Sequence, residues 1–156
     1  MTRKEIVSRA IERRGPPRLP IHYCNRDFEY SDTGNVGYGT AGDFVPREAG
    51  DSEWGFVWEV LDGTMGQPKT HPLADDSALA AYRPPDPHAP GRFDGFAEQI
   101  AAHEDRFIKF GLGITGFNQA TFLRGYEAFM LDLRTDPGQA GRVADMVFDF
   151  ENGIID

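Results

Sequence analysis

The chain has 156 residues, a hydrophobic content of 40% and a formal net charge of −9, which fits about one domain with a packed core. Such an acidic chain does not suit nucleic acid or an anionic membrane, because phosphate contacts need clustered Lys and Arg. No apolar run approaches the roughly 20 residues of a membrane span. The single cysteine, Cys24, excludes an internal disulfide. Because the first ten residues also lack the apolar segment of a secretory signal, we expect a cytoplasmic protein.

The N-terminal residues predict a helix that begins at a capping box. Thr2 is followed three residues later by Glu5, and an apolar stripe follows, formed by Ile6, Val7, Ala10 and Ile11. The Pro-containing segment 15–20 ends this helix, and residues 19–23 then predict a short strand. Residues 31–43 are rich in Gly and polar residues, so we expect a long loop there.

Residues 51–73 predict a β-hairpin with an aromatic face. Alternate positions of its first arm carry Trp54, Phe56, Trp58 and Val60, which is the period of two that is typical of a strand. An Asp-Gly turn follows within residues 61–66, and residues 67–73 form the expected returning strand. Pro68 would keep that strand at an edge.

The second half alternates between helical and strand patterns. A Pro-rich connector, residues 83–91, precedes a helical stripe of Phe93, Phe96, Ile100 and Ala101, and residues 106–114 predict a buried strand. Residues 122–133 predict one long amphipathic helix, with Phe122, Tyr126, Phe129, Met130 and Leu133 on its apolar side. The alternation of strands and helices favours an α/β fold over a bundle or a sandwich.

The end of the chain predicts two further features. Asp136 and Pro137 are expected to cap and open a last helix, with Val143, Val147 and Phe150 on its inner face and Gly153 as its candidate C-cap. Within the preceding helix, Gly125 costs about 1 kcal/mol relative to Ala, so it indicates close packing there, with Arg124 reaching an acidic side chain.

Two segments match the G-x-G-x-x-G pattern of dinucleotide-binding proteins, residues 37–42 and 111–116. The second follows a strand and precedes a helix, but two helices come next, where a dinucleotide fold needs a second strand that ends in an acid. The first has no Lys-Ser/Thr after it, which excludes a P-loop. A tightly packed β-to-α loop is the better interpretation of residues 111–116. Nucleotide binding stays an alternative, and stabilisation by NAD or ATP would test it.

His22 and Cys24 have a spacing that could begin a zinc site, but the chain has no second cysteine and its other histidines are scattered, so we predict no metal site. His22 is either a ligand-binding residue at the end of a first strand or a hydrogen-bonded, half-buried histidine. Trp54 is expected in the core. Asp51 and Glu53 beside it are either a general acid with its neighbour or two exposed acids next to a turn.

Three segments in order, residues 51–73, 82–93 and 113–137, resemble the uroporphyrinogen decarboxylase superfamily, and the N-terminal segment 3–20 fits the opening helix of that family. The resemblance covers essentially the whole chain, residues 1–156. It implies a (β/α)₈ TIM barrel with its site at the C-terminal mouth of the strands. Such barrels take about 250 residues, so the chain would be a partial barrel of about three β/α units with an inserted hairpin.

The resemblance is closest to the decarboxylase-like and corrinoid-dependent methyltransferase-like branch. Uroporphyrinogen decarboxylases carry an "RQAGRY" segment that holds the substrate carboxylates, whereas residues 24–30 read "CNRDFEY", with Arg26 alone. The resemblance therefore implies methyl transfer to or from a corrinoid protein, with uroporphyrinogen III decarboxylation as the alternative. Zinc would be bound by the part of the barrel that this chain lacks. A further alternative is a non-catalytic fragment, or a half-barrel whose exposed edge binds a second chain that completes it.

The resemblance also implies roles for individual residues at the mouth of the barrel. His22, Asn25 and Asn118 would orient a small-molecule substrate through hydrogen bonds, and Trp54 and Phe117 would form the wall of the pocket. Asp51 or Glu53 is the nearest candidate proton donor, provided that burial raises the pKa of its carboxyl group.

Overall fold

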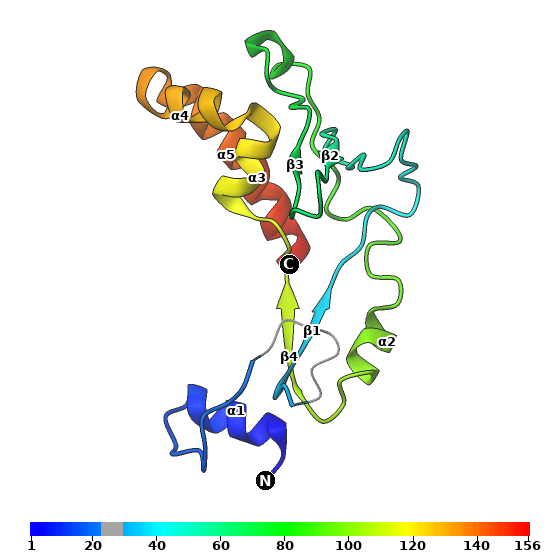
Figure 1. Cartoon of the computed structure of the whole chain (residues 1–156), viewed down its shortest axis with the longest axis vertical. Coiled ribbons are helices and arrows are strands. Elements are labelled where there is room, and N and C mark those ends of the chain that lie inside the picture. Colours follow the sequence, from blue (N-terminus) through cyan, green and yellow to red (C-terminus); the bar gives the residue numbers. More distant parts are fainter. Residues whose placement is uncertain (23–29) are drawn as a thin grey trace. The chain divides into compact units, whose positions relative to one another are not determined.

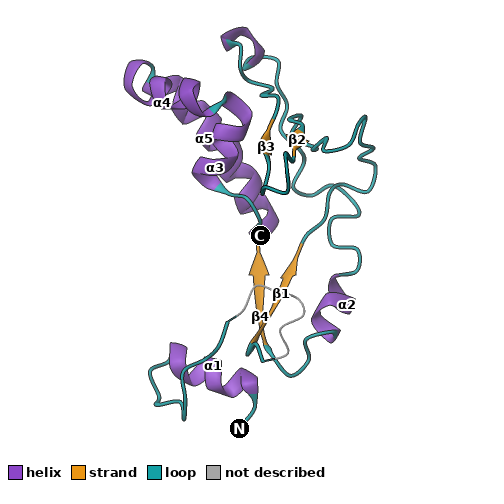
Figure 2. Ribbon diagram, in the orientation of Figure 1, coloured by secondary structure: helices purple, strands orange, loops and turns teal. Residues whose placement is uncertain are grey.

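The computed structural model describes residues 1–22 and 30–156, and these form two compact units that are interleaved in the sequence. Unit 1 comprises Met1–Gly39 and Phe93–Gly111, and unit 2 comprises Thr40–Arg92 and Leu112–Asp156. Figure 1 follows the chain through both units, and Figure 2 shows that helices and loops predominate over strands. Each unit is described by itself.

Unit 1 is built on a pair of parallel strands. Its elements are α1 (Arg3–Ile11), β1 (Thr33–Gly37), α2 (Phe96–Ala101) and β4 (Phe107–Gly111). The register of β1 and β4 runs from Thr33 opposite Phe107 to Gly37 opposite Gly111. Because α2 lies between the two strands in the sequence, they form a β–α–β unit, as a parallel connection requires.

The expected loop over residues 31–43 is wrong at its centre, where β1 lies. Gly34 explains the difference, because a Cβ atom built there would lie 2.4 Å from Cγ of His103. The glycine therefore makes room for an imidazole ring packed on the strand, and its presence in the sequence does not indicate a loop. Residues 19–22 lie outside any strand, contrary to the prediction, and Tyr23 lies outside the described residues.

One face of the parallel pair is apolar and is partly covered by α2, with Phe110 still 38% exposed. Alternation places Gly34, Val36, Ile108 and Phe110 on this face. Phe110 lies edge-on to Phe96 of α2, with ring centroids 5.9 Å apart. Gln99 of α2 also clasps the end of β1, since its side chain accepts from the Gly37 N–H at 3.0 Å and donates to the Gly37 carbonyl at 3.2 Å.

The opposite face of the pair is mainly polar. Thr33, Asn35 and Lys109 share it, because cross-strand partners in a parallel pair point to the same side and Asn35 is the partner of Lys109. No residue of β4 is buried, so the predicted strand at 106–114 is confirmed as a strand, over Phe107–Gly111, but not as a buried one. We call this surface the polar face of unit 1.

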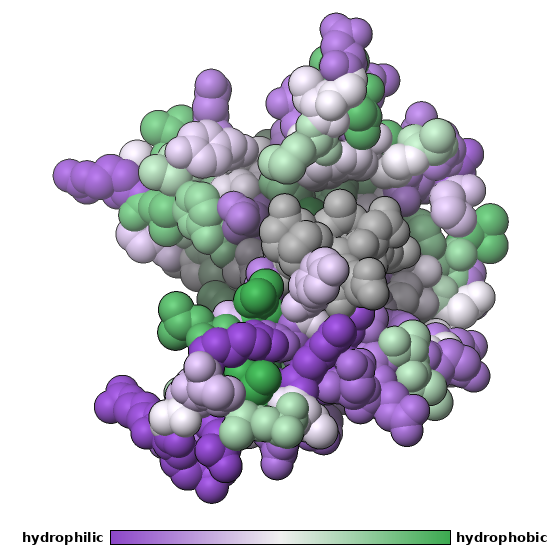
Figure 3. Space-filling view, turned by 60° about the horizontal axis from the view of Figure 1, so that its bottom comes forward, coloured by the Kyte–Doolittle hydropathy of each residue, from purple (hydrophilic) through white to green (hydrophobic). Residues whose placement is uncertain are grey.

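Helix α1 confirms the predicted capping box. The Glu5 N–H donates to Thr2 Oγ1 at 3.1 Å, and the Thr2 N–H donates to the Glu5 carboxylate at 2.8 Å. Ile6 and Val7 are buried, whereas Ile11 is 64% exposed, so the predicted stripe is shorter than expected. Figure 1 shows α1 at the amino end of the two strands, and hydrophilic residues gather along the lower margin of Figure 3, where this end comes forward.

Unit 2 contains the predicted hairpin, in a shorter form. Its strands β2 (Trp58–Glu59) and β3 (Gln67–Pro68) pair in antiparallel fashion, and one isolated antiparallel bridge joins Asp51 and Val57. The Asp-Gly turn is confirmed: Asp62 and Gly63 both have positive φ, 48° and 72°, and the Thr64 N–H donates to the Leu61 carbonyl at 2.9 Å. The predicted first strand fails over its first half because Gly55 has φ 83°, which bends the chain out of the strand.

The aromatic residues of the hairpin still enter the core of unit 2, although they do not lie on one strand. Trp54 packs edge-on against Phe150, with ring centroids 4.9 Å apart, and Phe56 packs edge-on against Phe122 at 5.7 Å. A turn therefore places these side chains in the core, whereas the alternation predicted that they lie on one face of a single strand.

Three helices complete the unit: α3 (Gly116–Arg124), α4 (Tyr126–Thr135) and α5 (Pro137–Ile155). The single helix predicted over 122–133 is wrong, because Gly125, with φ 88° and ψ 137°, separates α3 from α4. Tyr126, Met130 and Leu133 are consequently exposed, while Phe129 is buried.

Helix α5 follows the prediction closely. Asp136 caps it by accepting from the Gln139 N–H at 3.0 Å, and Val143, Val147 and Phe150 are buried. Gly153 is not a C-cap, since the helix continues to Ile155. A Cβ atom at Gly153 would lie 2.5 Å from Cγ of Pro87, so this glycine admits the Pro-rich segment to the helix surface. In the described part of the chain, no helix combines the length and apolar character that crossing a bilayer needs.

Candidate functional site

A chain of hydrogen bonds crosses the polar face of unit 1. His22 Nδ1 lies 2.7 Å from Thr33 Oγ1, and His22 Nε2 lies 3.1 Å from Lys109 Nζ. Thr33 Oγ1 lies 3.3 Å from Ser31 Oγ, which donates to the Thr33 carbonyl at 2.9 Å. Four side chains from two strands and one loop are therefore connected.

The contact with Lys109 fits one tautomer of His22. An ammonium group has N–H donors only, so Lys109 donates to Nε2, and this requires the tautomer that carries its proton on Nδ1. The Nδ1–H group then donates to Thr33 Oγ1.

Lys109 is the cation of this face, and it has no carboxylate partner among the described residues. It donates to an imidazole nitrogen, which is neutral, and a Lys ammonium has three N–H donors. The chain carries 25 Asp and Glu against 16 Lys and Arg, so acidic partners are plentiful. The other lysine that lies beside a strand, Lys69, does pair with a carboxylate, Glu59, at 3.1 Å.

The backbone just before the polar face is anchored by a buried acid. Asp32 is fully buried, its carboxylate accepts from both terminal nitrogens of Arg18 at 2.6 and 2.7 Å, and it also accepts from the Ile21 N–H at 2.7 Å. The Arg18 guanidinium lowers the pKa of Asp32. This ion pair holds the segment that ends at His22 against the start of β1.

Asp51 does not meet the condition for a proton donor. Arg47 forms a two-point ion pair with it, at 2.8 and 2.9 Å, and the Arg47 N–H donates to the same carboxylate. These contacts lower the pKa of Asp51 to about 2, whereas a general acid needs a raised pKa. Asp51 is therefore ionised at neutral pH and fixes the loop that precedes the hairpin.

Glu53 is also engaged in structure. Its carboxylate accepts from Arg92 at 2.7 and 3.0 Å and from the Ala41 N–H at 3.2 Å. The Arg92 side chain is fully buried and lies over the Phe150 ring at 5.0 Å. A surface pocket of about 500 Å³ adjoins this pair, lined by residues that include Phe44, Asp86 and Pro90. Because its buried charges neutralise each other, the pocket offers a ligand no unpaired charge from this pair.

The remaining predicted residues divide between core and surface. Trp54 is buried, and its carbonyl accepts from the Tyr82 hydroxyl at 2.8 Å, while burial raises the pKa of Tyr82. Phe117 is 49% exposed and packs against Phe129 at 5.7 Å, and its neighbour Asn118 is exposed on α3. Asn25, and Cys24 with it, lies outside the described residues.

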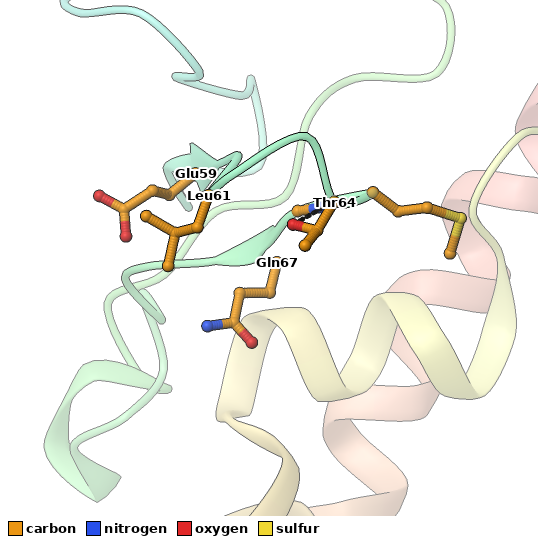
Figure 4. A pocket seen from close by; sticks show the side chains of 6 residues that line it. Glu59, Leu61, Thr64 and Gln67 are labelled. Atoms are coloured by element: carbon orange, nitrogen blue, oxygen red, sulfur yellow. Dashed lines mark hydrogen bonds between the residues drawn. The ribbon is translucent and has the colours of Figure 1, made fainter.

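A second surface pocket, of about 460 Å³, lies on the hairpin and is lined by Glu59, Leu61, Thr64, Met65, Gly66 and Gln67. Figure 4 shows that the Glu59 and Gln67 side chains point in different directions and do not converge. Glu59 is already paired with Lys69. This pocket therefore supplies no set of convergent polar groups.

Within residues 1–22 and 30–156 no group of three or more His, Cys, Asp or Glu side chains could hold a metal ion. The zinc that the family resemblance implies therefore has no ligand set in the described part of the chain, and we derive no step through it.

Sequence reasoning identified His22 but missed Thr33 and Lys109. A signal for Lys109 was present, because it is the one charged residue inside the apolar run "FIKFG" of β4. A charge at such a position must lie on a polar or solvated face of the strand. Thr33 gave no signal, because β1 was expected to be loop.

Comparison of the chain with protein-family models, with curated proteins and with solved structures gives no match.

Proposed function

We propose that the chain is the N-terminal part of an α/β-barrel enzyme of the uroporphyrinogen decarboxylase-like kind, acting on a small molecule by methyl transfer with a corrinoid protein. The observation that carries the proposal is the two-faced β1–α2–β4 unit. One face of its strands is partly covered by a helix, and the other carries His22, Thr33 and Lys109. In α/β barrels, helices lie outside the strands and the opposite strand face points inward.

The positions of the insertions support the same assignment. The long excursion of residues 40–92 begins after the carboxyl end of β1, and residues 112–115 follow the carboxyl end of β4. Barrel enzymes place their ligand-binding loops at these ends of the strands. In this proposal His22, which contacts Thr33 at the amino end of β1, and Lys109, in the middle of β4, contribute from the inward strand face rather than from these loops, and the charge of Lys109 is one that the resemblance did not suggest.

The missing second arginine in residues 24–30 favours methyl transfer over porphyrinogen decarboxylation. In such a transfer the acceptor supplies the electron pair of the new bond to the methyl group, and the pair of the broken bond stays with the donor. The corrinoid, held by a partner protein, would carry the methyl group. The described residues of this chain would bind and orient the small molecule.

The decisive experiment uses the product of the complete reading frame that contains these residues. One arm supplies methylcobalamin with a thiol acceptor and follows loss of the methylated corrinoid by visible absorbance. The other arm supplies uroporphyrinogen III and follows release of carbon dioxide. We expect turnover in the corrinoid arm only, reduced at least tenfold by His22→Gln. Turnover in the porphyrinogen arm, or in neither arm, would overturn the proposal. The same reading frame should also encode further β/α units with a Cys/His set.

A further inference from the structure

The ammonium group of Lys109 is held in a defined direction and is paired with a neutral group. His22 Nε2 lies 3.1 Å from Lys109 Nζ, and the imidazole is itself oriented by Thr33 at 2.7 Å. The lysine is half-buried on β4, so it gives up part of its hydration without gaining a carboxylate among the described residues. An anion that contacts the ammonium group would compensate for this lost hydration.

Two neighbours on the same face serve an anion site in different ways. Asn35 is exposed and is the cross-strand partner of Lys109, so its amide group can donate beside the ammonium. His22 holds the ammonium group in place through its Nε2. Asp32, the acidic residue directly before β1, is already bound by Arg18 and is fully buried, so it does not compete with an anion for Lys109.

We propose that Lys109, Asn35 and His22 form a binding site for an oxyanion, a carboxylate or a phosphate group of a small molecule, on the polar face of unit 1. The inference deepens the proposed function and rests on it, since the anion would belong to the same small-molecule substrate. Lys109 contributes a point charge with two further N–H donors, Asn35 a neutral donor, and His22 orients the ammonium group.

The buried arginines give a contrast within the same molecule. Arg92 and Arg124 each meet a carboxylate at 2.7 Å and also donate to backbone carbonyls, of Asp86 and Leu73 respectively. Their donors are used inside unit 2. On the polar face of unit 1, by contrast, Lys109 has more N–H donors than described partners, and its cross-strand partner Asn35 is exposed.

The test is an anion titration of the isotope-labelled chain by NMR. Sodium acetate and sodium methyl phosphate are each added against sodium chloride at constant ionic strength, because screening alone would otherwise shift the signals. The probes are the backbone amides of Asn35 and Lys109 and the ring signal of His22, which is identified by its loss in His22→Gln. We expect saturable shifts with one or both oxyanions and none with chloride. The stronger of the two arms distinguishes a carboxylate from a phosphate.

Lys109→Met should weaken the response at least tenfold, and Lys69→Met, which removes a lysine of unit 2, should leave it unchanged. If Lys109→Met loses its native signal dispersion, Lys109→Gln takes its place. Absence of saturation in the unmodified chain, or an equal response after either Lys109 substitution, would overturn the proposal. The titration needs no methyl donor, so anion binding without methyl transfer would reject the proposed function and keep the site.

Discussion

The two units treat their charged groups in opposite ways. In unit 2, Arg92 and Arg124 are buried, and each is enclosed by carboxylates and carbonyl oxygens. On the polar face of unit 1, Lys109 donates to a neutral imidazole and meets no described carboxylate. Charged groups that are fully hydrogen-bonded inside a unit stabilise its structure. An ammonium group that has more N–H donors than described partners, on an exposed face, is available to a ligand. Substitutions should therefore damage unit 2 through its stability and unit 1 through its binding.

The largest expected effect is that of Arg124→Met. Arg124 donates to Asp132 at 2.7 Å and pairs with Asp76, so its loss leaves the buried carboxylate of Asp132 without a cation, with only the Gln139 amide at 3.4 Å. Removing one partner of a buried ion pair costs about 3–5 kcal/mol. Both tryptophans, Trp54 and Trp58, lie in unit 2, so the fluorescence change in a urea titration reports this unit. The control is Arg134→Met at an exposed position of α4, with an expected change below about 0.5 kcal/mol. Equal midpoints for the two variants would contradict the assigned role.

Gly125→Ala should have the next largest effect. The residue has φ 88°, and a Cβ atom there would contact the His71 ring at 3.4 Å. We expect a loss of about 1–3 kcal/mol from backbone strain. Gly141→Ala is the matched control, because Gly141 lies within α5 with open space at its Cβ position, and it should stabilise by up to about 1 kcal/mol. Opposite signs for the two substitutions in the same urea assay are the required result.

A smaller effect, and one that depends on pH, is expected for Asp51→Asn. The pKa of Asp51 in the folded chain is lowered from 3.8 to about 2 by Arg47. A lowered folded pKa stabilises the fold above the unfolded pKa, and this stabilisation disappears as the pH falls from about 4 to about 2. The advantage of the unmodified chain over the variant should therefore be full at pH 7, decrease between about pH 4 and 2, and vanish below about pH 2. Asp149→Asn removes an exposed carboxylate with no ion pair in the described part of the chain, and its difference should not vary in this way. A constant difference for Asp51→Asn would reject the ion pair.

The smallest effect on stability is expected for Lys109→Met. This substitution tests the difference between the two units most directly. The substitution removes a half-exposed ammonium that has no described carboxylate partner, so unit 1 should change by less than about 0.5 kcal/mol. The Phe107 N–H donates to the Asp32 carbonyl at 2.9 Å, so the parallel register directs the N–H groups of Gly34 and Val36 toward β4. Amide hydrogen exchange at Gly34 and Val36 therefore measures the stability of the β1–β4 pair. If these amides exchange ten times faster in the variant, Lys109 has a structural role and the distinction between the two units fails.

The sequence predicted local features well and spatial ones poorly. The capping box at Thr2 and Glu5, the Asp62-Gly63 turn and the cap of α5 at Asp136 are confirmed, because each depends on residues within a few positions of one another. The acidic partner expected for Arg124 is confirmed as well, in Asp132 and Asp76.

Three of the failures share one cause, which is contact between distant segments. Gly34 accommodates His103, Gly153 accommodates Pro87, and Gly125 lies against His71. Each glycine was assigned from its neighbours in the sequence to a loop, a cap or a helix interior. Its actual role is set by contact with the ring of a residue that is distant in the sequence, and a single sequence does not reveal such a contact.

The candidate site shows the same limit. His22 was selected for its place after an expected strand, yet its partners Thr33 and Lys109 come from two strands whose pairing no local pattern predicts. The acids Asp51 and Glu53 were selected for their place beside Trp54, but both are paired with arginines: Asp51 with the nearby Arg47, and Glu53 with the distant Arg92.

The pairing of β1 with β4 also has a consequence for the order of folding. Residues 38–106 separate the two strands in the sequence, so the ladder forms only after a long loop has closed. Contacts between distant residues form late, because the loss of chain entropy precedes the gain from the contact. Helix α5, whose backbone bonds are all local, should gain protection first in a pulse-labelling experiment. On this view the polar face assembles last during folding, after most of the helices are in place, and earlier protection of β1 than of α5 would show the reverse order.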